Sequence, residues 1–172
     1  MAYIERFQGS EDFKVDSKYR LSVPVEFRRV LESQDPEWNS DKFARMVLIY
    51  SPRLENYVEG YSIETISEIR EALTRKPKTD KGAEKARRHF IHNALTVTVD
   101  DTGRIVVPAK VRDKLGLGKE DYVTFLGDLK TFQLWKKDVY DAVMGEDEDD
   151  DFDPDAFMDD LLYGGADAGG AE

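Results

Sequence analysis

The chain repeats one stretch of sequence, since VDSKYRLSVPVEFR at residues 15–28 returns as VDDTGRIVVPAKVR at residues 99–112. Six of the fourteen aligned positions are identical, and the pair Leu31 and Leu115 continues the same register. Sequence similarity within a chain at one fixed offset indicates a duplicated structural unit. The sequence therefore predicts a fold made of two copies of one unit, with equivalent residues in equivalent places.

Each copy has the pattern of a strand, a turn, a second strand and a helix. In the second copy, residues 95–99 alternate apolar and polar side chains as a half-buried strand does. Asp100 favours the opening of a turn, and Gly103 can take the positive φ that hairpin turns often need. The chain then returns as a strand, Pro108 suits the start of a short helix, and Gly116 suits its end.

The first copy repeats this pattern with one departure. Strands are expected at residues 13–15 and 21–23, followed by a helix at residues 24–31. Its turn opens at Asp16, but Tyr19 stands where the second copy has glycine. A tyrosine at positive φ costs on the order of 1 kcal/mol or more. Either this turn has another geometry, or packing of the ring offsets the strain.

A second pair of strands and further helices follow each copy. Strands are expected at residues 45–50, 57–61, 122–126 and 131–135. Helices are expected from Ser62 to the stop at Pro77, at residues 80–93 and at residues 136–144. Short hairpins are unstable alone, so we expect the two copies to interleave in one barrel-like core of a β-rich α+β fold.

The net charge of -11 belongs to the C-terminal tail. Twelve of the 36 acidic residues and none of the 25 basic residues lie after Gly145, so residues 1–145 are close to neutral. The absence of cysteine excludes a thiolate nucleophile, an iron–sulfur cluster and a sulfur-ligated zinc. The sequence shows neither a signal peptide nor the roughly 20 consecutive apolar residues of a membrane helix. We expect an intracellular, soluble protein that does not contact a membrane.

Signals for catalysis are weak throughout the sequence. It contains no Gly-x-Ser-x-Gly elbow, no Walker A loop and no dinucleotide fingerprint. His89 and His92 stand at helical i,i+3 spacing but lack an evident third ligand for a metal ion. We therefore expect no enzyme, no metal, no cofactor and no small-molecule substrate.

Basic residues gather around the first predicted turn, where Lys14, Lys18, Arg20, Arg28 and Arg29 outnumber Asp16 and Glu26. The candidate DNA contacts are Lys14, Lys18, Arg20, Arg28, Arg104 and Lys110. An arginine just past a hairpin tip can form bidentate bonds to a phosphate or a guanine edge. The alternative is an internal bond of each arginine with the aspartate that opens its turn. The residues expected to shape the turns are Asp16, Asp100 and Gly103. Residues 75–92 contain seven basic residues and two acidic ones. Three interpretations stay open for this segment: a second basic patch that binds DNA, a surface between subunits, or only a solvated helix.

The paired turns, Asp16 to Arg20 and Asp100 to Arg104, resemble those of the MraZ family. In each copy an apolar-x-Val-Pro helix start follows, and the resemblance covers residues 7–144. The second motif matches the family pattern throughout, whereas the first departs from it at Tyr19. The resemblance implies the duplicated swapped-hairpin barrel shared with the AbrB and SpoVT DNA-binding proteins, with flanking helices.

The resemblance also implies domain limits and a function. AbrB-like repeats are expected at residues 7–54 and 91–144, with a strand and helices between them at 55–90 and an acidic tail at 145–172. Members of the family regulate transcription of the bacterial division and cell-wall gene cluster, and bind short direct repeats at their own promoter as ring-shaped homo-oligomers. The implied partners are double-stranded DNA with tandem short repeats and further copies of the chain, in the cytoplasm at the nucleoid.

The acidic tail has a composition that does not support a folded domain, and we expect it to be disordered. Within it, Asp153 and Pro154 can cap a short helix with one apolar face. Such a helix either docks on the basic hairpin and competes with DNA or recruits another protein, and a merely solubilising tail is the alternative. Two further functions stay open: an oligomeric scaffold that recruits partners through the tail, and an antitoxin-type DNA binder.

Overall fold

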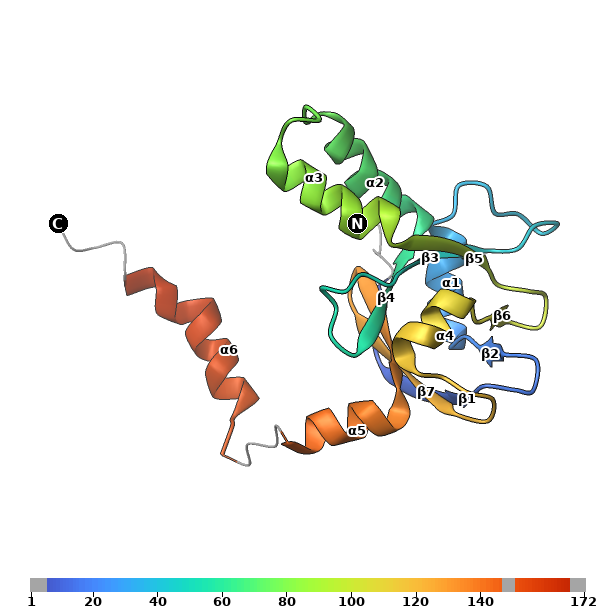
Figure 1. Ribbon diagram of the computed structural model, residues 1–172. Coiled ribbons are helices and arrows are strands. Elements are labelled where there is room, and N and C mark those ends of the chain that lie inside the picture. Colours follow the sequence, from blue (N-terminus) through green and yellow to red (C-terminus); the bar gives the residue numbers. More distant parts are fainter. Residues whose placement is uncertain (1–5, 147–150, 168–172) are drawn as a thin grey trace. The chain divides into compact units, whose positions relative to one another are not determined.

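The computed structural model of the chain describes residues 6–146 and 151–167 (Figure 1). These residues form two compact units, which divide between Asp141 and Ala142. The first unit has the predicted α+β character, because antiparallel sheets are flanked by helices. No helix within the described ranges has the length and the apolar character that a membrane crossing requires.

Six strands form the larger sheet of the first unit, and all neighbouring pairs are antiparallel. In spatial order they are β1 (Ser10–Lys14), β7 (Tyr122–Asp128), β8 (Thr131–Lys136), β4 (Tyr57–Ser62), β3 (Arg45–Ile49) and β5 (Ala94–Thr98). A separate two-stranded ribbon pairs β2 (Arg20–Ser22) with β6 (Arg104–Val106). Each strand overlaps a segment predicted from the sequence pattern.

Most strand pairs join one half of the chain to the other. The first strand of each copy pairs with a strand of the opposite half. β1 lies against β7, and β5 lies against β3. The pairs β2–β6 and β4–β8 also join the two halves. Among the strands described, β3–β4 and β7–β8 are the pairs formed within a half. Each half therefore depends on the other for its strand partners.

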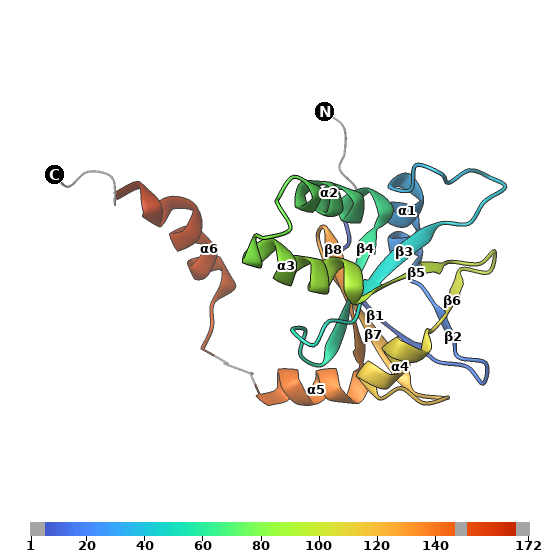
Figure 2. The same cartoon turned by 45° about the horizontal axis from the view of Figure 1, so that its top comes forward.

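Helices flank the strands close to their predicted positions. They are α1 (Val25–Ser33), α2 (Ile63–Thr74), α3 (Lys81–Arg87), α4 (Ala109–Leu115) and α5 (Lys137–Glu146). The Ser62 side chain accepts a hydrogen bond from the Thr65 amide and caps α2, and Gly116 ends α4 at a φ of 66°. α3 runs beside α2 (Figure 2) and changes into a π-helical turn at Arg88–His92, where one regular helix was expected.

One apolar core is shared by both copies. Its equivalent buried pairs are Val15 and Val99, Leu21 and Ile105, Val23 and Val107, Phe27 and Val111, and Leu31 and Leu115. Phe7, Phe27 and Phe132 add a cluster of rings, with the centroids of Phe7 and Phe132 4.8 Å apart. Full burial of such side chains contributes about 1.5–3 kcal/mol each. The core thus stabilises the contact between the copies as well as each copy.

The second unit contains the helix α6 (Pro154–Tyr163). Asp153 Oδ1 accepts hydrogen bonds from two backbone amides of its first turn, at 3.0 and 3.3 Å, as the predicted cap does. The short helix expected within the acidic tail is therefore present, because a good cap and a helical apolar spacing favour it locally. Disorder over residues 145–172 as a whole stays a prediction. Residues 147–150 and 168–172, which belong to the same prediction, lie outside the described residues.

Candidate nucleic-acid interface

The two predicted turns share one hydrogen-bond pattern. Asp16 Oδ1 accepts bonds from the amides of Lys18 and Arg20, at 2.8 and 2.9 Å. Asp100 Oδ1 accepts bonds from the amides two and four residues later, at 2.9 and 3.0 Å. Each aspartate thus closes its own turn and fixes the start of the strand that follows. In both views the two turns lie on the same side of the first unit (Figures 1 and 2).

Both aspartates favour the ionised form. The backbone amide of Arg20 is the main cause that lowers the pKa of Asp16 to about 2. The hydroxyl of Thr102 is the main cause that lowers the pKa of Asp100. Hydrogen bonds to a carboxylate stabilise its charged form. Each turn therefore holds a negative charge at neutral pH, which the nearby cations must exceed if the turn is to attract a phosphate.

The turns have the same left-handed backbone at Tyr19 and Gly103, with φ values of 59° and 79°. Of the two possibilities that the sequence left open for Tyr19, the structure shows the packed ring. The guanidinium carbon of Arg112 lies 3.9 Å from the ring centre, and Lys119 Nζ lies 5.4 Å from it. A cation over an aromatic ring contributes about 0.5–2 kcal/mol, which is comparable to the strain of a tyrosine in this conformation.

The two turn arginines converge because β2 pairs with β6. Arg20 Nε donates to Asp16 Oδ2 at 2.7 Å. Arg104 Nε donates to Thr102 Oγ1 at 2.9 Å, and its Nη1 lies 3.9 Å from Asp16 Oδ2. About a third of each arginine side chain remains exposed, at 35% and 32%. The alternative to DNA contact was a bond between each arginine and the aspartate that opens its own turn. Arg20 makes this bond with Asp16. The Arg104 side chain instead contacts Thr102 and the Asp16 of the opposite turn. These contacts leave part of each arginine accessible.

The other predicted contacts lie in different surroundings. Lys18 is exposed at the tip of the first turn. Lys14 Nζ pairs with Glu120 at 2.7 Å, and Lys110 Nζ donates to the Tyr50 hydroxyl at 3.2 Å. Arg28 is half-buried on α1, with its guanidinium over Gly103. The structure thus brings Lys18, Arg20, Arg104 and Arg28 to the turns, whereas Lys14 and Lys110 bind partners on other elements.

Sequence reasoning missed Arg112 and Lys119, which flank the first turn. Arg112 had a signal, because it stands where the first copy has Arg28 in the aligned repeat. Lys119 had none, because the loop that carries it has no counterpart in the repeated motif. With these two residues and Lys18, the first turn is the more basic one, since the second turn has Thr102 in place of Lys18.

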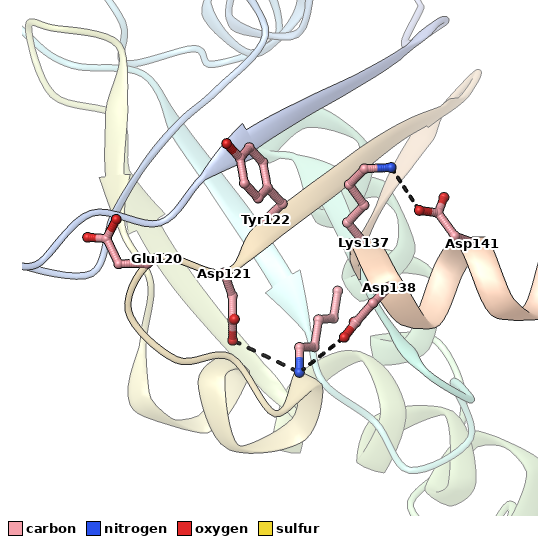
Figure 3. Close-up of a pocket in the computed structure, with 7 residues that line it drawn as sticks. Glu120, Asp121, Tyr122, Lys137, Asp138 and Asp141 are labelled. Atoms are coloured by element: carbon pink, nitrogen blue, oxygen red, sulfur yellow. Dashed lines mark hydrogen bonds and ion pairs between the residues drawn. The ribbon is translucent and has the colours of Figure 1, made fainter.

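A hollow of about 290 Å³ lies at the start of β7, the end of β8 and the start of α5 (Figure 3). Its lining is Glu120, Asp121, Tyr122, Lys136, Lys137, Asp138 and Asp141. Lys136 pairs with Asp121 and Asp138 at 4.0 and 3.7 Å, and Lys137 pairs with Asp141 at 2.8 Å. Its lysines are therefore neutralised locally. Within residues 6–146 and 151–167, no group of three or more His, Asp or Glu residues is placed to hold a metal ion.

The chain is similar to known proteins that share one family name. The sequence model of a family described as "MraZ protein, putative antitoxin-like" matches residues 90–161. A protein of Ruegeria sp. (strain TM1040) named "Transcriptional regulator MraZ" is 42% identical over 161 residues, which are 90% of this chain and 95% of the relative. Proteins of the same name from Ruegeria pomeroyi and Acetivibrio thermocellus are 37% identical, over 90% of this chain and 95% of the relative, and 30% identical, over 82% and 88%.

Proposed function

The chain belongs to the MraZ family, and from this premise we propose that it is a transcriptional regulator that binds DNA with its two turns. The observation that carries the proposal is the convergence of Arg20 and Arg104 on one ribbon, each held by its turn and each partly exposed. Oriented guanidinium groups at a turn fit phosphates and guanine edges. Its relatives are named as regulators, and the proposal includes no catalytic step.

The fold that we propose is the duplicated swapped-hairpin barrel. The strand pairs between the halves support it, because β1 joins the second half and β5 joins the first. In this scheme residues 7–54 and 91–144 are the two AbrB-like repeats. Residues 55–90 connect them, and residues 145–172 form the acidic tail. The equivalent buried pairs of the core support the same scheme.

The contacts that we propose differ in strength. Lys18, Arg20 and Arg104 bind DNA directly, and the first turn contributes more because Lys18 is exposed at its tip. Lys14 and Lys110 bind flanking phosphates only after they leave Glu120 and Tyr50. Those exchanges cost little, because both pairs are exposed and surface pairs of this kind are worth about 0–1 kcal/mol.

The assembly that we propose is a ring of copies on tandem short repeats. One pair of turns offers few contacts, and linked copies raise the affinity through effective concentration. The proposed targets are repeats at the promoter of the chain's own division and cell-wall gene cluster, at the nucleoid in the cytoplasm.

The experiment is a fluorescence-anisotropy titration with DNA from upstream of the chain's own gene and with scrambled DNA, at several salt concentrations. We expect preference for the upstream DNA and steep weakening with salt. Arg20→Ala and Arg104→Ala should each lower the specific affinity and reduce the salt slope by about one. Arg29→Ala is the control, because Arg29 lies exposed on α1 and pairs with Glu26. Equal binding of both DNAs, with and without the tail, refutes the proposal.

A protein scaffold is the second candidate, and α6 is the observation that favours it. Its apolar residues are exposed, among them Phe157, Leu161 and Leu162 at 55–64%. Such a helix can bind a groove of a partner protein. Loss of all promoter regulation in the cell on Leu161→Asp, with DNA affinity unchanged, would favour the scaffold. Retained regulation would remove it.

A further inference from the structure

Two arginines at equivalent positions of the repeat each contact the other copy. Arg28 on α1 and Arg112 on α4 occupy the same place in the two aligned sequences. Each of them lies on the turn of the other copy: Arg28 covers Gly103, and Arg112 covers Tyr19. The positions that they cover are themselves equivalent, because Tyr19 and Gly103 also align with each other in the repeat. The same contact is therefore made twice, in opposite directions.

Arg112 contacts Tyr19 face on. Its guanidinium carbon lies 3.9 Å from the ring centre, within the range of a cation–π interaction. The ring also packs against the shared core. Because Tyr19 has a φ of 59°, the contact fixes the one residue of the turn whose backbone is strained. Arg112 therefore holds the tip of the first turn in place.

Arg28 makes the corresponding contact without a ring. Gly103 has a φ of 79°, and a methyl group added there would overlap the Arg28 guanidinium. The guanidinium thus occupies the space that a side chain would need. Gly103 is buried although it belongs to a turn. Arg28 therefore covers the tip of the second turn.

The burial of one nitrogen atom in each arginine supports a fixed position. The Nε atoms of Arg28 and Arg112 are buried and have no hydrogen-bond partner among the residues that the structure describes. A buried donor without a partner is unfavourable, and an arginine with no other contacts would turn this atom to water. The packing of both guanidinium groups on the opposite turns outweighs that cost in the fold.

We propose that Arg28 and Arg112 are positioning residues that couple the two DNA-binding turns. Each holds the other copy's turn, so that Arg20 and Arg104 leave the ribbon in a fixed mutual orientation. The role in DNA recognition rests on the proposed function, in which these turns contact DNA. Arg28, predicted from the sequence as a DNA contact, then acts through the second turn and not on a phosphate.

Amide hydrogen exchange of the full chain tests the coupling without DNA. Arg112→Ala should speed exchange at the amides of Lys18 and Arg20 by about tenfold, which is the size expected from loss of one cation–π contact. Arg28→Ala should do the same at Thr102 and Arg104. The opposite pattern, with each variant loosening only its own copy's turn, overturns the proposal, and so does unchanged exchange in both turns. Arg29→Ala should change neither turn.

DNA titration separates positioning from direct contact. A positioning residue changes specific affinity but not the number of phosphates neutralised. Arg28→Ala and Arg112→Ala should therefore weaken specific binding about tenfold with the salt slope of the wild type, whereas a lost phosphate contact reduces the slope by about one. Arg112→Lys should not restore affinity, because lysine keeps the charge but lacks the planar group that lies on Tyr19.

The outcomes distinguish this inference from the proposed function. A reduced slope in Arg28→Ala and Arg112→Ala, or full rescue by Arg112→Lys, overturns the positioning role while DNA binding stands. Absence of specific binding by the wild-type chain removes the proposed function, and exchange then decides the coupling alone. Circular dichroism and urea unfolding of each variant check that the fold is retained.

Discussion

Replacement of Gly103 by alanine should destabilise the protein through two separable effects. An alanine at a φ of 79° carries left-handed strain of about 1–2 kcal/mol. Its methyl group would also overlap the Arg28 guanidinium, so that this side chain must leave its position at a further cost of about 1 kcal/mol. Gly103→Ala should therefore lower the free energy of unfolding by about 2–3 kcal/mol.

Gly116→Ala is the matched control. Gly116 has a φ of 66°, but no atom lies within 4 Å of the position that a methyl group would take. Gly116→Ala should therefore lower the free energy of unfolding only by the cost of the left-handed strain, about 1–2 kcal/mol. The double variant Gly103→Ala/Arg28→Ala removes the overlap, so Gly103→Ala should cost less in the Arg28→Ala background by about 1 kcal/mol.

The assay is urea unfolding at one protein concentration, because assembly would otherwise shift the apparent stability. Equal losses for Gly103→Ala and Gly116→Ala, together with an additive double variant, would refute the placement of Arg28 on the second turn.

Two further predictions concern charge. Asp35 is buried and accepts bonds from Arg45 at 2.8 and 3.0 Å, and the Arg45 side-chain hydrogen bond is the main cause that lowers the pKa of Asp35. Its stabilising contribution is therefore present above the unfolded pKa of about 3.9 and is lost as pH falls through the folded value. Unfolding of Asp35→Asn, followed from pH 6 to pH 2, should show a smaller loss of stability on acidification than the wild type, and an equal loss would contradict this. Deletion of residues 146–172 removes twelve acids and no base, so affinity for DNA at low salt should rise several-fold. An unchanged affinity, with the same salt slope, would eliminate competition by the tail.

Local signals in the sequence predicted most elements of the fold. The alternation at residues 95–99, the cap at Ser62 and the stop at Gly116 each depend on neighbouring residues alone, and the structure has a strand or a helix end at each. The duplication predicted equivalent buried pairs such as Leu21 and Ile105. These features were predictable because backbone preference and apolar spacing act over a few residues.

Contacts between the copies were not predictable in the same way. The position of Arg112 on Tyr19 depends on how α4 of one copy meets the turn of the other, which no local pattern encodes. For the same reason the partners of Lys14 and Lys110 were missed, because Glu120 and Tyr50 lie far away in the sequence. The π-helical turn at Arg88–His92 departs from a regular helix in a stretch where the sequence has no proline.

Because β1 pairs with β7, β1 has no strand partner for part of the synthesis of the chain on the ribosome. Ser10 pairs with Leu126 and Lys14 pairs with Tyr122, so the partner of β1 is made more than a hundred residues later. At about 5–20 residues per second, β1 waits roughly 5–20 s before it can enter the sheet. An unpaired strand is open to pairing with other chains in that interval. β1 consists of Ser10, Glu11, Asp12, Phe13 and Lys14, and its three charged residues oppose such pairing until its partner emerges.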